Sequence, residues 1–251
     1  MTIPRPSVVF LDLGDTLVRA HPSWAGVYRM GLSDAGIEVV ESELEQALVE
    51  ATRAGGWALE VAFEATEQAS FERIKEFDAR VLASIGHADL PDDVFRAIEA
   101  SFGARAAWHV FPDVIPAIEA LHAAGLRLAV ITNWLWGAPE LLHDLELARH
   151  FEALIVSARV GFNKPHPGIF EHALEVMAVA PAEAIHVGDS YAADIVGARR
   201  VGITPVLIDR RSPDPARVRE LHDDPDLPVI SDLYGLLDLL GVARPVGSRF
   251  G

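Results

Sequence analysis

Residues 8–17 have the sequence VVFLDLGDTL, an apolar run that ends in a carboxylate and is then broken by a glycine. The stretch Val8–Asp12 begins with β-branched residues and has no polar residue before Asp12. Such a run is typical of a strand that is buried on both faces of a parallel sheet. Because functional side chains gather at the carboxyl ends of parallel strands, Asp12 is a candidate functional residue.

After residue 112 the chain alternates between apolar strand patterns and amphipathic helix patterns. Strands are predicted at 126–132, 153–157, 184–188 and 204–209, and helices at 114–124, 139–148, 167–178 and 191–201. Such alternation implies right-handed crossovers and a parallel sheet that helices cover on both faces. The sequence therefore predicts an α/β fold with a Rossmann-like parallel sheet. Segment 210–228, rich in Pro, Asp and Arg, is predicted to be a surface loop.

The stretch 22–105 shows no strand pattern and is predicted to form a small helical bundle. Ser42 and Glu45 have the spacing of a capping box at the start of one helix. Pro91–Asp93 is typical of the start of another helix. The predicted domains are an α/β core, residues 1–18 and 108–251, and an all-helical domain, residues 19–107, inserted after the first strand.

The composition limits the classes of function. The chain has 251 residues, of which 50% are hydrophobic, with a formal net charge of −16 and no cysteine. The acidic balance argues against nucleic-acid or anionic-membrane binding, and neither a membrane-spanning run nor a signal-peptide pattern is present. The absence of cysteine excludes disulfides, thiolate metal sites and a cysteine nucleophile. We expect a soluble cytoplasmic protein, for which a monomer and a homodimer both remain open.

Chemically active side chains stand just beyond the ends of four predicted strands. Asp12 follows the first, Thr132 and Asn133 close the second, Lys164 comes seven residues after the third, and Asp189 follows the fourth, with Asp194 five residues further on. Lys164 is one of only two lysines in the chain. Taken singly, each of these residues has an ordinary structural explanation, such as a helix cap or a turn. Their joint occurrence at strand ends favours a shared chemical role.

This set of side chains suits the Mg²⁺-assisted transfer of an anionic group. Mg²⁺ prefers a few carboxylate oxygens and keeps water and substrate oxygens as its other ligands. A carboxylate can act as a nucleophile and form an acyl-phosphate. The departing group needs a positive point charge and hydrogen-bond donors, which Lys164, Thr132 and the backbone amides of residues 14–16 can supply.

Four segments resemble, in order, the motifs of the haloacid dehalogenase-like (HAD) hydrolase superfamily. They are residues 12–17 (DLGDTL), 130–133 (VITN), 164–170 (KPHPGIF) and 186–190 (HVGDS) together with Asp194. The resemblance covers residues 8–209. It implies a phosphatase of subfamily I, in which the helical insert is a cap of the C1 type.

The resemblance also implies roles for individual residues. Asp12 would be the nucleophile that forms an aspartyl-phosphate, and Thr132, Asn133 and Lys164 would bind the substrate phosphate. The metal ligands would be Asp12, the backbone carbonyl of Gly14, Asp189 and Asp194, with Asp194 acting through a water or orienting Lys164. The implied cofactor is Mg²⁺, and the implied substrate is a small phosphorylated metabolite.

The sequence departs from the family pattern at position 14. Family phosphatases have a second Asp two residues after the nucleophile, where it protonates the leaving oxygen and later activates water, whereas this chain has Gly14 followed by Asp15. Either Asp15 reaches the leaving group from a shifted turn, or proton transfer, typically worth 10²–10⁴-fold, is impaired. Two alternatives to a phosphatase therefore stay open: a metal-independent dehalogenase, in which Asp12 forms a carboxylic ester, and a non-catalytic binding protein of this fold.

Aromatic residues of the insert can either line a substrate pocket or pack inside the helical bundle. Helical spacing favours the bundle core. Trp134 and Trp136, which follow the second motif, and Arg19 and Arg159 are further candidates for substrate contact. The aromatic residues concerned are Trp24, Tyr28, Trp57, Phe63, Phe71 and Phe77.

Overall fold

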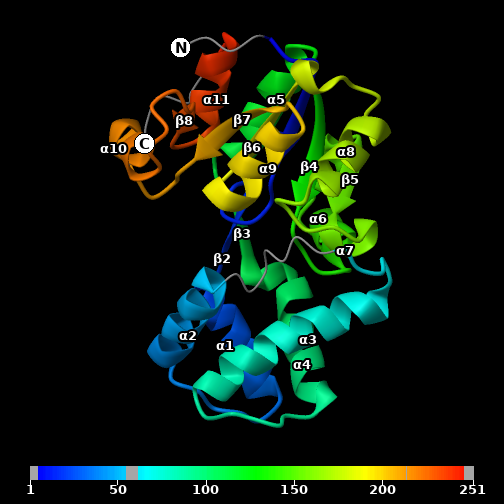
Figure 1. Ribbon diagram of the computed structural model, residues 1–251, viewed down its shortest axis with the longest axis vertical. Coiled ribbons are helices and arrows are strands. Elements are labelled where there is room, and N and C mark those ends of the chain that lie inside the picture. Colours follow the sequence, from blue (N-terminus) through cyan, green and yellow to red (C-terminus); the bar gives the residue numbers. More distant parts are fainter. Residues whose placement is uncertain (1–4, 55–61, 213, 246–251) are drawn as a thin grey trace.

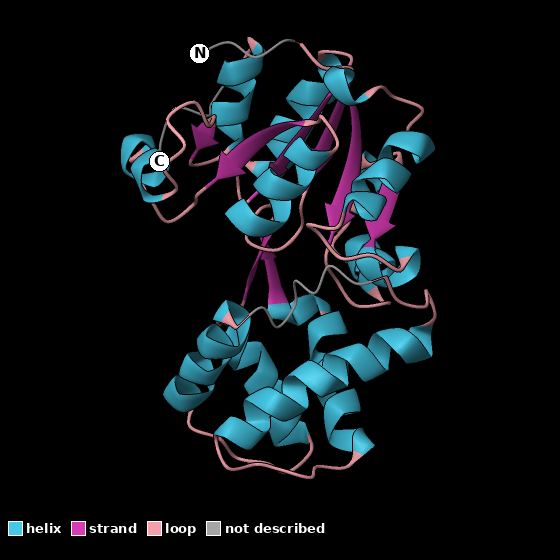
Figure 2. Ribbon diagram, viewed as in Figure 1, coloured by secondary structure: helices cyan, strands magenta, loops and turns pink. Residues whose placement is uncertain are grey.

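The computed structural model describes residues 5–54, 62–212 and 214–245. Figure 1 shows a sheet flanked by helices at one end of the molecule and a group of helices, α1–α4, at the other. A narrow two-stranded ribbon runs between the two parts (Figure 2). Its strands, β2 (Val18–Ala20) and β3 (Trp108–Val110), pair antiparallel.

The main sheet has six strands in the order β5-β4-β1-β6-β7-β8, and all neighbouring pairs are parallel. The strands are β1 (Val8–Leu11), β4 (Arg127–Thr132), β5 (Ala153–Val156), β6 (Ala184–Gly188), β7 (Thr204–Ile208) and β8 (Val229–Ile230). After β5 the chain crosses to the other side of β1, so the strand order reverses at β1. A crevice for ligands therefore lies beyond the carboxyl ends of β4, β1 and β6. The predicted α/β fold with a parallel sheet is confirmed.

The central strand β1 is fully buried, as its continuous apolar pattern requires. Val9 and Leu11 belong to a hydrophobic cluster on one face, while Val8 and Phe10 belong to a cluster on the other. Helices α5 (Val114–Ala123) and α11 (Leu233–Leu240) contribute to the first cluster, and α8 (Pro167–Val176) and α9 (Val196–Arg200) to the second. Both faces of the sheet are thus covered.

The helical part consists of α1 (Trp24–Asp34), α2 (Glu41–Arg53), α3 (Glu67–Ser84) and α4 (Asp92–Gly103). The side chains of Ser23 and Thr66 cap the first and third of these helices by accepting backbone N–H groups. Helices α1 and α4 cross closely at Gly31, where a Cβ atom would lie 2.5 Å from the Cα of Ile98. No helix among the described residues is both long and apolar enough to cross a membrane.

Several local predictions are wrong. Segment 210–228 contains a helix, α10 (Pro215–Leu221), whose start is capped by Asp214, so it is more than a surface loop. The capping box at Ser42 and Glu45 does not form, because α2 already begins at Glu41 without a side-chain cap. Predicted helix 139–148 is too long, since α6 spans Ala138–Asp144. Predicted helix 191–201 is confirmed, and it consists of a π-helical turn, Tyr191–Ile195, followed by α9.

Candidate active site

Lys164 lies at the centre of the site, in the segment between α7 (Ser157–Val160) and α8. Its ammonium donates to Asp12 Oδ1 at 2.6 Å, to Asp194 Oδ1 at 2.6 Å and to the carbonyl of Ile131 at 2.9 Å. These three acceptors match the three donors of an ammonium group. The side chain is only 2% exposed, so its charge is held at one point in a buried setting.

Asp194 is held from three directions. Besides Lys164, its Oδ1 lies 2.8 Å from Nε2 of His186, and its Oδ2 accepts the backbone N–H of Ser190 at 3.0 Å. Gly188 makes this approach possible, because a Cβ there would lie 2.1 Å from the carboxyl carbon of Asp194. Both oxygens of Asp194 are therefore engaged inside the protein.

His186 was not predicted as a site residue, although it lies inside the fourth motif. It is fully buried within β6, and Nε2 must carry the proton because its partner is a carboxylate. A histidine in the middle of an otherwise apolar strand is the signal in the sequence that points to such a buried partner.

The site holds more negative than positive charge. Burial raises the pKa of Asp12, an effect that Lys164 partly offsets. Burial also raises the pKa of Asp189 well above its usual value, and the nearby carboxylates of Asp12 and Asp194 add to the rise. Although burial opposes ionisation, the attraction of Asp12 and Asp194 raises the pKa of Lys164, and Lys164 and His186 lower the pKa of Asp194.

The carboxylates of Asp12, Asp189 and Asp194 fit a divalent cation. One oxygen from each lies within 4.8 Å of the others, and they come from the ends of adjacent strands and the turn after β6. Hard oxygen donors in such a group are the ligands that Mg²⁺ prefers. Lys164 carries one positive charge against three carboxylates, and a cation there would balance the remaining negative charge.

Thr132 is the last residue of β4 and Asn133 follows it, and both line the same cavity as Asp12. Asn133 Nδ2 donates to the carbonyl of Lys164 at 2.9 Å, and the N–H of Lys164 donates to Asn133 Oδ1 at 2.7 Å. This paired contact fixes the backbone at Lys164, so the amide of Asn133 is committed to holding the lysine in place. Thr132 is buried at the end of its strand.

Gly14 and Asp15 form the turn after Asp12, beside two indole rings. A Cβ at Gly14 would lie 3.1 Å from the ring of Trp134 and 3.3 Å from that of Trp24. Asp15 has a φ of 52°, in the left-handed region that Asp tolerates better than most residues. Its Oδ2 accepts the indole N–H of Trp24 at 3.0 Å, so a residue of α1 holds the carboxylate of the turn.

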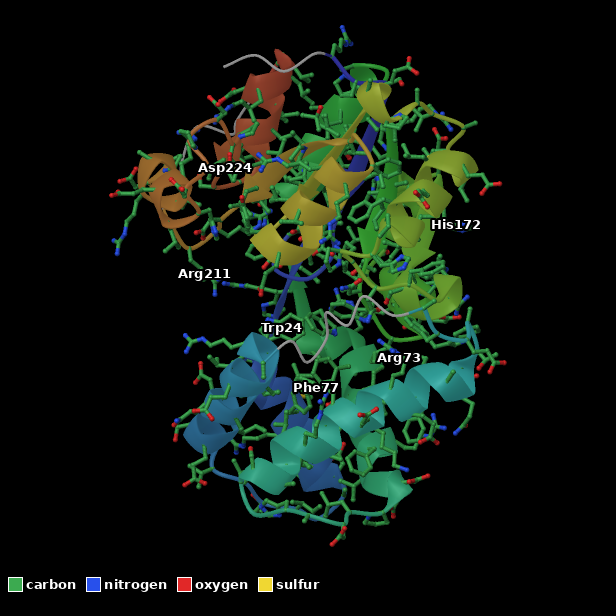
Figure 3. The ribbon with its side chains drawn as sticks, viewed as in Figure 1. Trp24, Arg73, Phe77, His172, Arg211 and Asp224 are labelled. Carbon is green, nitrogen blue, oxygen red and sulfur yellow. The ribbon has the colours of Figure 1, made fainter. Side chains whose placement is uncertain are left out.

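Two cavities meet at this turn. The catalytic cavity, of about 290 Å³, is lined by the site residues already described. A second cavity, of about 250 Å³, lies among α1–α4 and is here called the cap cavity. Trp24, Thr52, Asn133 and Trp134 line both cavities, and Figure 3 shows Trp24 where the helical part faces the sheet.

The structure also locates the other candidate substrate contacts. Trp24, Tyr28 and Phe77 line the cap cavity, Phe63 lines a smaller neighbouring pocket, and Phe71 packs in the helical core under Arg96. Trp57 lies outside the described residues. Arg159 stacks on Trp136 and pairs with Glu140, and Arg19 lies on β2. None of the three candidates Arg19, Trp136 and Arg159 lines either cavity.

Arg210, which the sequence analysis did not identify as a candidate, stabilises the loop that follows Asp12. Arg210 donates to the carbonyl of Thr16 at 2.7 and 3.0 Å and pairs with both oxygens of Asp113. Asp113 in turn accepts the N–H of Leu233 at the start of α11. Hydrogen bonds thereby connect the loop that follows Asp12 to the start of α11 through Arg210 and Asp113.

The chain is similar to known proteins over nearly its whole length. It is 29% identical to haloacid dehalogenase-like hydrolase domain-containing protein 3 of Bos taurus, covering 91% of this chain and 92% of that one. It is 35% identical to phosphoserine phosphatase of Thermus thermophilus, over 53% of this chain and 54% of that one. A crystal structure of a HAD phosphatase from Thermococcus onnurineus, 26% identical, superposes with a TM-score of 0.63, covering 95% of this chain and all of that one.

The family model that matches describes a haloacid dehalogenase-like hydrolase and spans residues 6–202, a range that contains every candidate residue described above. The chain thus belongs to the haloacid dehalogenase-like hydrolases.

Proposed function

We propose that the protein is an Mg²⁺-dependent phosphohydrolase that acts on a small phosphorylated metabolite. The observation that supports this most directly is the group of three carboxylates, Asp12, Asp189 and Asp194, two of which are buried and pair with the ammonium of Lys164. The site has both a nucleophile and a fixed positive charge, which phosphoryl transfer requires. Relatives named as phosphatases are consistent with this assignment.

In the first proposed step, one oxygen of Asp12 attacks phosphorus while Lys164 holds the other oxygen of the carboxylate. The new O–P bond gives an aspartyl-phosphate, and the bond from phosphorus to the leaving oxygen breaks with its electron pair on that oxygen. In the second step, water attacks phosphorus and the Asp12 carboxylate leaves. Lys164 and Thr132 bind the phosphoryl oxygens in both steps.

Asp12, Asp189 and the carbonyl of Gly14 would hold the metal ion. When bound, Mg²⁺ would neutralise charge on the phosphoryl oxygens. Because both oxygens of Asp194 already have protein partners, its main role in this proposal is to orient Lys164, with any contact to the ion made through water.

Asp15 takes the place of the missing acid–base residue in this proposal. It protonates the leaving oxygen in the first step and accepts a proton from water in the second. Asp15 lines the catalytic cavity, and the indole of Trp24 fixes its carboxylate. Residues 19–107 act as a cap on the core formed by residues 1–18 and 108–251, and they exclude bulk water during the reaction.

The test is the release of p-nitrophenol from p-nitrophenyl phosphate, with Mg²⁺ and with EDTA, by the wild-type protein and by Asp12→Asn. We expect turnover that requires both the metal and Asp12. Halide release from a 2-haloacid in EDTA would instead identify a dehalogenase. Tight binding of phosphate esters without turnover would identify a binding protein, the alternative that is open because Gly14 stands in place of the acid–base Asp.

A further inference from the structure

The cap cavity is placed to receive the part of a substrate that leaves with the alcohol. It shares four described lining residues with the catalytic cavity, among them Trp24 and Trp134. In the proposed mechanism Asp15 protonates the ester oxygen, so this oxygen would lie at the turn of Gly14 and Asp15 when phosphorus is at Asp12. The organic group beyond it would then extend toward Trp24 and Trp134, which adjoin this turn and line the cap cavity.

The lining of the cap cavity is mostly apolar and aromatic. Five aromatic side chains line it, and four of them contact one another with ring centroids 4.8–6.0 Å apart, in the pairs Trp24–Phe102, Trp24–Trp134 and Tyr28–Phe102. The remaining lining includes aliphatic side chains such as those of Leu48 and Ile98. A cavity of this kind favours apolar ligands with a few fixed polar contacts. The five aromatic residues are Trp24, Tyr28, Phe77, Phe102 and Trp134.

The side chain in the lining of the cap cavity that titrates near neutral pH is an acid. Among the described lining residues there is no Lys, Arg or His, and the one carboxylate is Asp78 on α3. Asp78 is 1% exposed, and its Oδ1 accepts the hydroxyl of Tyr28 at 2.7 Å, while its Oδ2 has no hydrogen-bond partner. Glu99 on the neighbouring helix α4 adds further negative charge near Asp78. Among these described lining residues a second anionic group on the substrate would meet no cation, and it would be repelled by Asp78 once that residue is ionised.

We propose that the cap cavity selects phosphate monoesters whose alcohol is apolar, with an aromatic ring or a branched chain, and carries no carboxylate or second phosphate. This inference rests on the proposed phosphatase function and narrows its substrate class. The aromatic walls bind the alcohol by area burial and ring contacts. At a pH where Asp78 is ionised, its charge disfavours anionic alcohols.

The first experiment compares kcat/KM for 2-phenylethyl phosphate with that for 2-phosphoglycolate, both esters of primary alcohols. We expect the apolar ester to be preferred by at least tenfold. Equal turnover of the two esters, or a preference for 2-phosphoglycolate, would overturn the proposal while leaving the phosphatase assignment intact. At about pH 8.5, where Asp78 of the wild type is ionised, the preference should shrink several-fold in Asp78→Asn, because the side chain keeps its shape and its acceptor for Tyr28 but loses its charge.

A matched pair of variants on α2 tests where the alcohol binds. Leu48 lines the cap cavity, whereas its neighbour Val49 is 43% exposed. Leu48→Trp fills the cavity and should raise KM for 2-phenylethyl phosphate at least tenfold more than KM for methyl phosphate, whose alcohol does not reach the cavity. Val49→Trp should leave the ratio of the two KM values unchanged. Equal effects of Leu48→Trp on both esters would contradict the proposed location.

A binding measurement separates failure of this inference from failure of the proposed function. Saturation-transfer NMR can detect 2-phenylethanol on the Asp12→Asn protein, which needs no turnover. Binding that Leu48→Trp weakens and Val49→Trp does not would support the cavity assignment even if no ester is hydrolysed. Absence of binding to a folded Asp12→Asn protein would refute it.

Discussion

Asp78 is a buried acid whose charge opposes folding. Burial, with a further contribution from Glu99, raises the pKa of Asp78 from an ordinary 3.8 to about 7, despite the hydrogen bond from Tyr28. This rise corresponds to a preference of about 4 kcal/mol for the neutral form in the folded protein. Replacement of Asp78 by Asn keeps the shape and the acceptor for the Tyr28 hydroxyl, and removes the ionisation.

The sign of the pH effect follows from proton binding. Between about pH 4 and pH 7 the folded state keeps the proton on Asp78, while the unfolded state has released it. The folded state therefore binds more protons, and the free energy of unfolding falls as pH rises through this range. The stabilising contribution is complete below the unfolded pKa and is lost once pH passes the folded pKa.

The assay is urea unfolding of wild-type protein and Asp78→Asn at pH 5 and pH 8. The free energy of unfolding of Asp78→Asn minus that of wild type should be about 2–3 kcal/mol larger at pH 8 than at pH 5. The reason is that the wild type loses about 1.4 kcal/mol per pH unit until the pH reaches the folded pKa of Asp78. Glu76→Gln, which changes an exposed acid on the same helix, should show no such increase. A difference between Asp78→Asn and wild type that is the same at both pH values would refute the reasoning.

Three further outcomes are expected. Asp15→Asn should lower kcat/KM by 10²-fold or more for an alkyl phosphate but by much less for p-nitrophenyl phosphate, whose leaving oxygen needs no proton; equal losses would exclude an acid role. Gly31→Ala should destabilise the protein by about 1–3 kcal/mol in thermal or urea unfolding, because the new Cβ meets the backbone of Ile98, whereas Gly103→Ala, with open space around it, should be neutral or slightly stabilising. Mg²⁺ should raise the melting temperature of wild type and not of Asp189→Asn, and a shift that persists in the variant would place the ion elsewhere.

The sequence predicted the sheet and the grouping of the candidate residues because both depend on local patterns. Val8–Leu11 is apolar throughout, and only a doubly covered strand buries such a run. Once the strands are parallel, their carboxyl ends meet at one edge, which brings Asp12, Thr132 and Asp189 together. The placement of Lys164 against Asp12 required only that its loop return to that edge.

Features that depend on tertiary contact were not predictable in this way. The ribbon of β2 and β3 pairs segments about ninety residues apart in the chain, and each strand has only three residues, too few to show a period. Segment 210–228 looks like a loop because its helix α10 is short and begins at a Pro. Asp78 appears in the sequence as an ordinary helix acid, and only the fold shows that it is buried beside Tyr28.

The glycine at position 14 has a physical explanation in the aromatic wall between the two cavities. Trp24 and Trp134 lie so close to Gly14 that a Cβ atom there would be 3.3 and 3.1 Å from their respective rings, a tight contact that would require the indoles to shift. The same two rings line both cavities, and Trp24 donates its N–H to Asp15. The two indole rings thus leave little space for an Asp side chain at position 14. The carboxylate of this turn is instead that of Asp15, which Trp24 holds by a hydrogen bond. In the proposed enzyme, the residue that shapes the leaving-group cavity and the residue that positions the proton donor are therefore the same tryptophan.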